Sequence, residues 1–359
     1  MKSRLKRLVA ILLVNLILIG LGVIVLELIF GNWIRPDNLN KLNIIRSRTI
    51  SYDITDLYDH PSNTITYSRD EYGLRGSFEE PDEIDILTVG GSTTDQRYIS
   101  DGQTWQDVIQ YRFRSIGKNV VVANAGVDGQ STYGHIKNFD WWFPCIPNLK
   151  PKYILFYVGL NDFYNEGGSR YDALVRNEKS FRQVLREKSA IYHAFRTLEG
   201  IYKARIVHEV GHIGSIDFSE MEWTTTPLQK DYDMLMDKQL SEYAERLTIL
   251  IAKTREFGSE PIFVTQPSRR YRFNEGSLKG TKTPLQYGGV LINGVDYYHM
   301  MRRLDSVTCS TSLEHNVMCI DMAKDNLWED EDFYDFWHMT PTGAKKAGDY
   351  LFEGLKEKF

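Results

Sequence analysis

The stretch from Ile84 to Tyr98 constrains the fold of this 359-residue chain more than any other. It begins with a short apolar run rich in β-branched residues, the composition of a strand buried on both faces of a parallel sheet. Gly90 and Gly91 follow, and they allow a sharp turn that would present Ser92 at the carboxyl end of the strand, where α/β sheets bind ligands. The pattern predicts a hydroxyl on a rigid turn, although by itself it also fits an ordinary strand-to-loop turn.

Strand and helix patterns alternate along much of the remaining chain. Strands are predicted at 119–123, 153–158, 261–265 and 317–321, and helices at 104–116, 231–257, 296–306 and from Pro341 onward. This alternation predicts an α/β fold with a doubly wound parallel sheet. In two stretches the spacing of apolar residues fits neither a helix nor a strand. We interpret 163–230 as an insertion over the mouth of the site, and 266–294 as a long loop at the same edge.

Three further motifs supply groups that an acyl-transfer site needs. The sequence VVVANAGVDGQST places Gly129 in a Gly-rich loop after the second strand, and YILFYVGLND places Asn161 at the end of the third. Asp335 and His338 lie three residues apart, just before the last helix. A serine hydroxyl at its free pKa is a poor nucleophile, so it needs a base and a group that orients the base. Asp335 and His338 suit these roles, whereas each motif alone would also fit a structural turn.

With these four motifs in order, the chain resembles the SGNH, or GDSL-type, hydrolases over about 83–357. The resemblance implies a three-layer α/β/α sandwich with a flavodoxin-like five-stranded parallel sheet. It implies a catalytic triad of Ser92, Asp335 and His338, with Ser92, Gly129 and Asn161 forming the oxyanion hole. This chain has Gly91 where the family often has aspartate, so the hydrogen bonds that organise the Asn161 motif should be arranged differently. We expect neither a metal nor a cofactor.

The amino terminus predicts a membrane anchor. Four cationic residues precede the apolar stretch 8–30, which at ~1.5 Å per residue is long enough for a ~30 Å hydrocarbon core. The cationic head favours the cytoplasmic side, which places the rest of the chain outside the cytoplasm. A cleaved signal peptide is the main alternative. We therefore divide the chain into a tail and anchor (1–30), a stem and lead-in (31–82) and a hydrolase-like domain with its insertion (83–359).

Composition and short motifs exclude some classes of function and leave others open. The net charge of −5, with no cationic cluster beyond the amino terminus, argues against nucleic-acid binding. The sequence HEVGH at 208–212 matches a zinc-peptidase motif, but Gly211 and the irregular surroundings favour a solvated surface. Cys309 and Cys319 would close a short loop in an oxidising compartment; alternatively, all three cysteines are small buried side chains.

The leading hypothesis is an extracytoplasmic, membrane-anchored serine esterase that removes acetyl or other short acyl groups. Its expected partners are an acyl-ester substrate and the membrane, and the assignment of that substrate to a carbohydrate or envelope glycan rests on family analogy. Two alternatives remain open. One is an O-acyltransferase that uses the same triad with a sugar hydroxyl in place of water. The other is a non-catalytic envelope or polysaccharide assembly protein that has kept the fold.

Overall fold

The computed structural model describes residues 2–31, 33–34, 39, 42, 44–164, 172, 184–185, 188–192, 194–195, 214–324 and 327–359. Contacts between Cα atoms divide the chain into two compact units. One comprises Met1–Asn43 and Val175–His208, and the other comprises Ile44–Leu174 and Glu209–Phe359. Much of the predicted insertion at 163–230, including the whole HEVGH motif, lies outside the described residues.

The second unit is built on a five-stranded parallel sheet. Its strands lie in the order β12 (Met318–Ile320), β7 (Glu260–Val264), β5 (Tyr153–Tyr157), β3 (Ile86–Gly90) and β4 (Val122–Asn124). Numbered by position in the chain, this is the flavodoxin-like order 2-1-3-4-5 read from the other edge, which confirms the predicted fold class. The order reverses beside β3. The carboxyl end of β3 is therefore the place where such sheets bind ligands.

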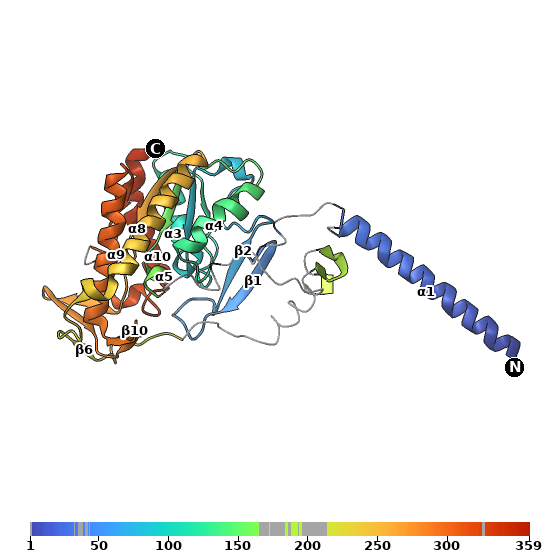
Figure 1. The fold of residues 1–359 in the computed structure, drawn as a ribbon, viewed down its shortest axis with the longest axis horizontal. Helices are drawn as coiled ribbons and strands as arrows, with labels where there is room; N and C mark the ends of the chain where they lie inside the picture. The colour runs from blue at the N-terminus through green and yellow to red at the C-terminus, as the bar shows by residue number, and fades with distance from the viewer. Residues whose placement is uncertain are drawn as a thin grey trace. The chain divides into compact units, whose positions relative to one another are not determined.

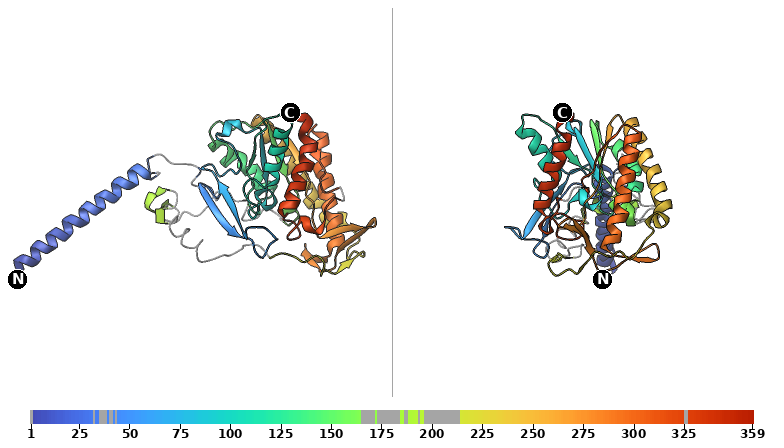
Figure 2. Two further views of the ribbon diagram at one scale, coloured as in Figure 1. Left: turned by 180° about the vertical axis from the view of Figure 1, so that it is seen from behind. Right: turned by 90° about the vertical axis from the view of Figure 1, so that its left-hand side faces the viewer.

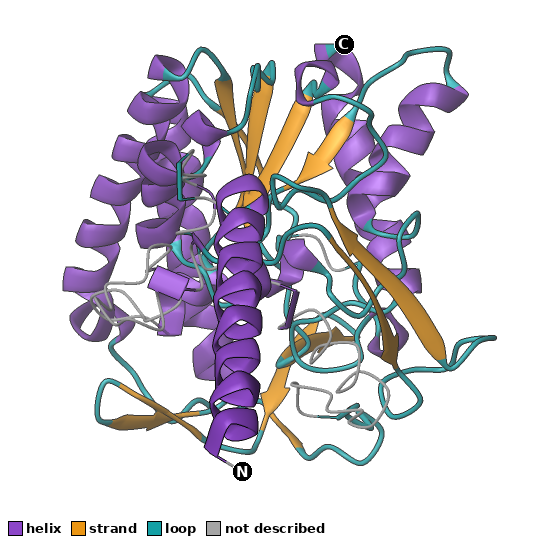
Figure 3. Cartoon of the chain, turned by 90° about the vertical axis from the view of Figure 1, so that its right-hand side faces the viewer, coloured by secondary structure: helices purple, strands orange, loops and turns teal. Residues whose placement is uncertain are grey.

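Helices cover both faces of this sheet (Figure 3). On one face α3 (Trp105–Ser115) packs against α10 (Pro341–Leu355), and on the other α8 (Tyr232–Glu256) packs against both α4 (Thr132–Trp141) and α9 (Gly294–Glu314) (Figure 1). Side chains of a strand alternate between these layers. Leu155 and Tyr157 join the core with α3 and α10, while Phe156 contacts Phe139 of α4. The continuous apolar runs in the sequence arise from this burial on both faces.

The lead-in before the sheet forms an antiparallel strand pair, β1 (Arg48–Asp53) with β2 (Thr64–Arg69), within the same compact unit. The expectation of a long loop at 266–294 was wrong, because this stretch contains two hairpins (Figure 2). One joins β8 (Tyr271–Asn274) to β9 (Ser277–Thr281), with β6 (Trp223–Thr224) at its edge, and the other joins β10 (Leu285–Tyr287) to β11 (Val290–Ile292). Glu275 and Gly276 have φ angles of 51° and 78°, which suit a two-residue hairpin turn.

The first unit contains α1 (Lys2–Phe30). Among the described residues, the segment Val9–Phe30 is the one helix long and apolar enough to cross a membrane, with a mean hydropathy of 3.1. A signal sequence has the same properties. Glu27, the acidic residue in this segment, accepts hydrogen bonds from the Ser189 hydroxyl at 2.6 Å and the Ala190 backbone N–H at 3.0 Å. These contacts give the Glu27 carboxylate hydrogen-bond donors near the end of an apolar helix.

Candidate active site

The turn after β3 holds Ser92 against the end of the sheet. Strand β3 ends at Gly90, and a short helix, α2 (Ser92–Asp95), begins directly after Gly91. A Cβ atom on Gly90 would lie 2.0 Å from the Thr94 hydroxyl oxygen, and one on Gly91 would lie 2.0 Å from the side-chain nitrogen of Asn161. Neither position has room for a side chain. The two glycines thus allow Asn161 and the serine turn to approach each other closely.

Ser92, His338 and Asp335 form a continuous chain of hydrogen bonds. The Ser92 Oγ lies 2.8 Å from His338 Nε2, and His338 Nδ1 lies 2.7 Å from Asp335 Oδ2. Asp335 and His338 sit on a tight turn closed by a β-bridge between Phe333 and Met339. The structure therefore brings together three residues separated by up to 246 positions in the sequence.

The environment of Asp335 favours its charged form. Burial opposes ionisation, but hydrogen bonds from the His338 side chain and from the backbone N–H groups of Trp337 and His338 outweigh it, so the pKa of Asp335 lies below its usual range. An ionised carboxylate only accepts hydrogen bonds, so Nδ1 of His338 carries the proton between them. His338 Nε2 is then the acceptor for the Ser92 hydroxyl. This is the tautomer that a general base acting on Ser92 requires.

The predicted oxyanion donors lie around the same turn. Asn161, in α5 (Leu160–Tyr164), donates one hydrogen bond from Nδ2 to the Gln130 carbonyl at 2.9 Å, which leaves its second amide hydrogen available. Gly129 precedes Gln130 and has a φ of +73°, a conformation that favours glycine. Within the described part of the chain, the backbone N–H groups of Ser92 and Gly129 have no hydrogen-bond acceptor. Three donors are thus available near the serine.

A buried network of hydrogen bonds and an ion pair organises the Asn161 motif. Asp162 accepts hydrogen bonds from the backbone and hydroxyl of Thr132 and forms an ion pair with Arg246 at 3.3 Å. Burial raises the pKa of Asp162, and Arg246 and Thr132 oppose that shift. Gln239 donates to the carbonyls of Asp162 and Phe163 near the end of α5. These contacts fix the helix that carries Asn161.

The lead-in contacts the serine turn through a second buried network, which the sequence reasoning missed. Asp95, in α2, accepts hydrogen bonds from the Tyr67 hydroxyl at 2.8 Å and from Arg69, both on β2. Arg75 donates to the backbone carbonyls of Asp95, Gln96 and Ile99. The only available signal in the sequence was the concentration of aromatic, arginine and glycine residues at 67–76. This composition does not indicate which residues those side chains contact.

The residues described here offer no obvious site for a metal. Within the described ranges, no group of three or more histidine, cysteine, aspartate or glutamate side chains is arranged to hold a metal ion. The HEVGH motif lies outside those ranges, so the structure does not test its interpretation as a solvated surface.

A hydrogen-bonded chain of serine, histidine and aspartate at the switch point of a parallel sheet is the arrangement expected of a serine hydrolase of the α/β class. The family model for GDSL-like lipase/acylhydrolase matches residues 86–351. The chain therefore belongs to the GDSL-like lipase/acylhydrolase family, whose members are hydrolases acting on ester bonds. The sequence-based recognition of this family is confirmed.

Solved structures of related hydrolases are similar at low sequence identity. An acetyl-xylooligosaccharide esterase variant from Geobacillus has 14% identity and a TM-score of 0.42, and the match covers 79% of this chain and 94% of that one. A lipase/acylhydrolase from Enterococcus faecalis has 13% identity and a TM-score of 0.41, and the match covers 77% of this chain and 97% of that one. No curated protein matches the chain. These similarities are too low to carry an argument about the substrate.

Proposed function

We propose that the protein is a membrane-anchored, extracytoplasmic serine esterase in which Ser92 is the nucleophile, His338 the general base and acid, and Asp335 the residue that orients His338. The hydrogen-bonded chain from Ser92 through His338 to Asp335 is the observation that carries this proposal. Ser92 Oγ attacks the ester carbonyl while Nε2 of His338 takes the hydroxyl proton. His338 then returns the proton to the departing alcohol, and water hydrolyses the acyl-enzyme by the same steps.

The oxyanion formed at each step accepts hydrogen bonds from the Ser92 and Gly129 backbone N–H groups and from Asn161 Nδ2. Two observations support this role. The two backbone N–H groups have no acceptor among the described residues, and the Asn161 amide has a second hydrogen available. Hydrogen-bond donors that are already in position need not move when negative charge develops on the oxygen. One such donor increases the rate constant by a factor of about 10²–10³.

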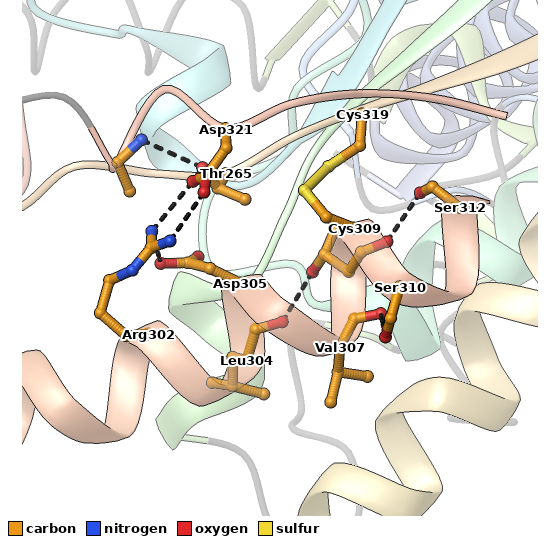
Figure 4. Close-up of a disulfide and its surroundings, with 12 residues drawn as sticks. Thr265, Arg302, Leu304, Asp305, Val307, Cys309, Ser310, Ser312, Cys319 and Asp321 are labelled. Atoms are coloured by element: carbon orange, nitrogen blue, oxygen red, sulfur yellow. Dashed lines mark hydrogen bonds and ion pairs between the residues drawn. A yellow bond between two sulfur atoms is a disulfide. The ribbon is translucent and has the colours of Figure 1, made fainter. Parts of the chain in front are cut away.

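Two features support the proposed location. The helix Val9–Phe30 has the length and hydropathy of a membrane span, and cationic residues precede it in the sequence. Cys309, in α9, forms a disulfide with Cys319, in β12 (Figure 4). Disulfides persist in oxidising compartments and are rare in the cytosol of mesophiles. Alkaline phosphatase fused after Phe359 should be active and a fluorescent cytoplasmic reporter dark; the opposite pair of results would reverse the orientation.

The proposed substrate is an acetyl or other short acyl ester, on a carbohydrate or envelope glycan. The carbohydrate part follows from resemblance to the family. Tyr164 and Trp337 support it structurally, because their rings lie 5.8 Å apart beside Asn161 and His338 and offer apolar faces to a substrate.

Kinetics of single and double variants test the mechanism. Ser92→Ala should lower turnover of an activated acetyl ester by several orders of magnitude, and His338→Ala should do nearly as much. The double variant should lose little more, because either change disables the same proton transfer. Adding a soluble sugar acceptor separates the alternatives. Free acetate as the main product supports an esterase, acetylated sugar indicates an acyltransferase, and no turnover of any ester favours an assembly protein.

A further inference from the structure

Arg270 differs from the arginines beside it in the sequence, because it has no acidic partner among the residues that the structure describes. Arg269 and Arg272 both form ion pairs with Asp330. Among the described residues, no carboxylate lies within ion-pairing distance of Arg270, and its buried Nε has no hydrogen-bond partner. A guanidinium has five N–H donors, and leaving a buried donor unsatisfied has a free-energy cost. Arg270 therefore has unused capacity to bind an anion.

Aromatic rings surround the Arg270 guanidinium. Its Cζ atom lies 4.1 Å from the ring centroid of Phe336 and 5.1 Å from that of Trp337. Burial raises the pKa of the Tyr164 phenol to about 12, and the charge of Arg270 and its side-chain hydrogen bond with Tyr164 oppose this shift. One of the guanidinium donors of Arg270 is thus used by Tyr164, and Nε is without a partner. Cation–π contacts orient the guanidinium plane without neutralising its charge. Arg270, Tyr164, Phe336 and Trp337 together are called the Arg270 site below.

The Arg270 site adjoins both sides of the catalytic centre. Trp337 directly precedes His338, and its indole N–H donates to the Tyr297 hydroxyl at 3.2 Å, which fixes the ring. Tyr164 lies in α5, three residues after Asn161. The site is thus flanked by the helix that carries a proposed oxyanion donor and by the turn that carries the proposed base.

The segment that carries Arg270 is itself fastened to the catalytic residues. At its start, Gln266 accepts a hydrogen bond at 3.0 Å from Thr93, the residue after Ser92. Further along, the Arg269 backbone N–H donates to the Phe336 carbonyl at 2.8 Å. Arg270 follows directly. These contacts hold the backbone that carries Arg270 in a fixed position relative to the residues proposed to perform the reaction.

We propose that Arg270 binds an anionic group of the substrate, a carboxylate or a phosphate carried on the same molecule as the ester. The planar guanidinium fork matches both groups, and charge-assisted hydrogen bonds of this kind are strong and directional. The aromatic walls contact the apolar part of the substrate between the anion and the ester. This inference rests on the proposed esterase function and deepens it, because it selects acidic esters over neutral ones.

The test compares three matched substrates with the full-length chain in detergent micelles. They are the acetylated forms of a methyl glucoside, a methyl glucuronoside and a methyl glucoside 6-phosphate, which differ in the presence and kind of anion. The parent enzyme should have a higher kcat/KM for one or both acidic substrates than for the neutral one. Arg270→Gln should lower kcat/KM for the preferred acidic substrate by about 10- to 100-fold, the range for hydrogen bonds to charged groups. It should change the neutral substrate by less than about 3-fold.

Two further variants separate binding from a structural role. Arg272→Gln is the matched control, because Arg272 also lies over an aromatic ring, 4.0 Å from the Trp223 centroid, but is paired with Asp330. It should leave the ratio of acidic to neutral rates unchanged. Arg270→Lys keeps the charge without the planar fork and should restore part of the preference. An equal loss for all three substrates in Arg270→Gln would contradict the proposal and indicate a structural role.

Measuring equilibrium binding to an inactive variant tests the inference without relying on turnover. In a Ser92→Ala background, the deacetylated methyl glucuronoside and methyl glucoside 6-phosphate should bind more tightly than methyl glucoside, and Arg270→Gln should remove that difference. Preference for the glucuronoside would identify a carboxylate as the anion, and preference for the phosphate a phosphorylated substrate. Equal binding of all three sugars would overturn the inference. Failure of the parent enzyme to hydrolyse even the neutral ester would instead overturn the proposed function.

Discussion

The guanidinium of Arg69, at the end of β2, pairs with the carboxylate of Asp95, three residues after Ser92. Both side chains are almost completely buried, with 4% and 3% of their surfaces exposed. Burial opposes the charge of Asp95, but Arg69 and Arg97 outweigh it and lower the pKa of Asp95. The pair joins the lead-in, which precedes the residues matched by the family model, to the turn that carries the proposed nucleophile.

We predict that Arg69→Ala will lower the free energy of unfolding by about 3–5 kcal/mol, because it leaves the Asp95 carboxylate buried without its main partner. Urea denaturation measures this change. The control is Lys253→Ala, which removes an ion pair to Asp140 from the surface and should cost less than about 1 kcal/mol. A loss for Arg69→Ala no larger than that of the control would show that the pair does not hold the serine turn.

Removing the proposed side-chain oxyanion donor should affect the transition state more than substrate binding. Asn161→Ala keeps Ser92 and His338 and should lower kcat by about 10²–10³ with little change in KM. Steady-state kinetics with a neutral acetyl ester measure both constants. Asn119→Ala, at an exposed position, should leave both constants within about 2-fold. A large rise in KM at unchanged kcat would assign Asn161 to ground-state binding instead.

The protonation of Asp305 should make stability depend on pH. Burial raises the pKa of Asp305 to about 8, and the ion pair with Arg302 only partly offsets the effect (Figure 4). Because this pKa is raised above the unfolded value near 3.9, folding takes up a proton between these values. The stabilisation is complete below about pH 4 and is lost as the pH rises towards about 8.

Asp305→Asn should therefore flatten the decline in unfolding free energy between pH 5 and pH 8. Urea denaturation at several pH values measures the slope, and Asp140→Asn on the exposed side of α4 provides the control. An unchanged slope in Asp305→Asn would mean that this carboxyl stays ionised beside Arg302.

The disulfide should contribute measurably to stability. Replacing Cys309 and Cys319 by serine removes a cross-link between residues separated by 10 positions, for which loss of the constraint on the unfolded chain costs about 2–3 kcal/mol. Alkylation of the unreduced, denatured protein should modify Cys145 only. Modification of all three cysteines in protein isolated without reductant would contradict the pairing and weaken the case for an oxidising compartment.

The sequence predicted those parts of the fold and site that depend on local patterns. Each sheet strand is a short, mainly apolar run. Ser92, Asn161 and His338 each lie at or near the end of a short local motif that is typical of a catalytic function. Sequence periodicity could not find the pairing of Arg69 with Asp95, because it joins segments 26 residues apart through side chains of common types. The role proposed for Arg270 could not be predicted from the sequence either. Among the described residues no carboxylate forms an ion pair with Arg270, and only the three-dimensional arrangement reveals this.

The hairpins at 271–292 were missed for a different reason. Three of their four strands mix polar or charged with apolar side chains over three to five residues, and the fourth, Val290–Ile292, is an apolar run of only three residues. Neither a clear alternation nor a long apolar run is therefore visible. The available signal in the sequence was Gly276 directly after the polar residues Asn274 and Glu275, because polar residues followed by glycine are common in tight hairpin turns.

Covalent labelling of Ser92 tests the central claim most directly. A fluorophosphonate reacts with a serine activated by a neighbouring base and needs no knowledge of the natural substrate. Full-length protein should acquire one phosphonyl adduct, located by peptide mass spectrometry on Ser92, and Ser92→Ala and His338→Ala should remain unlabelled. Labelling of Ser92→Ala to the same extent as the parent, or no labelling of the folded parent protein, would contradict the assignment of Ser92 as an activated nucleophile.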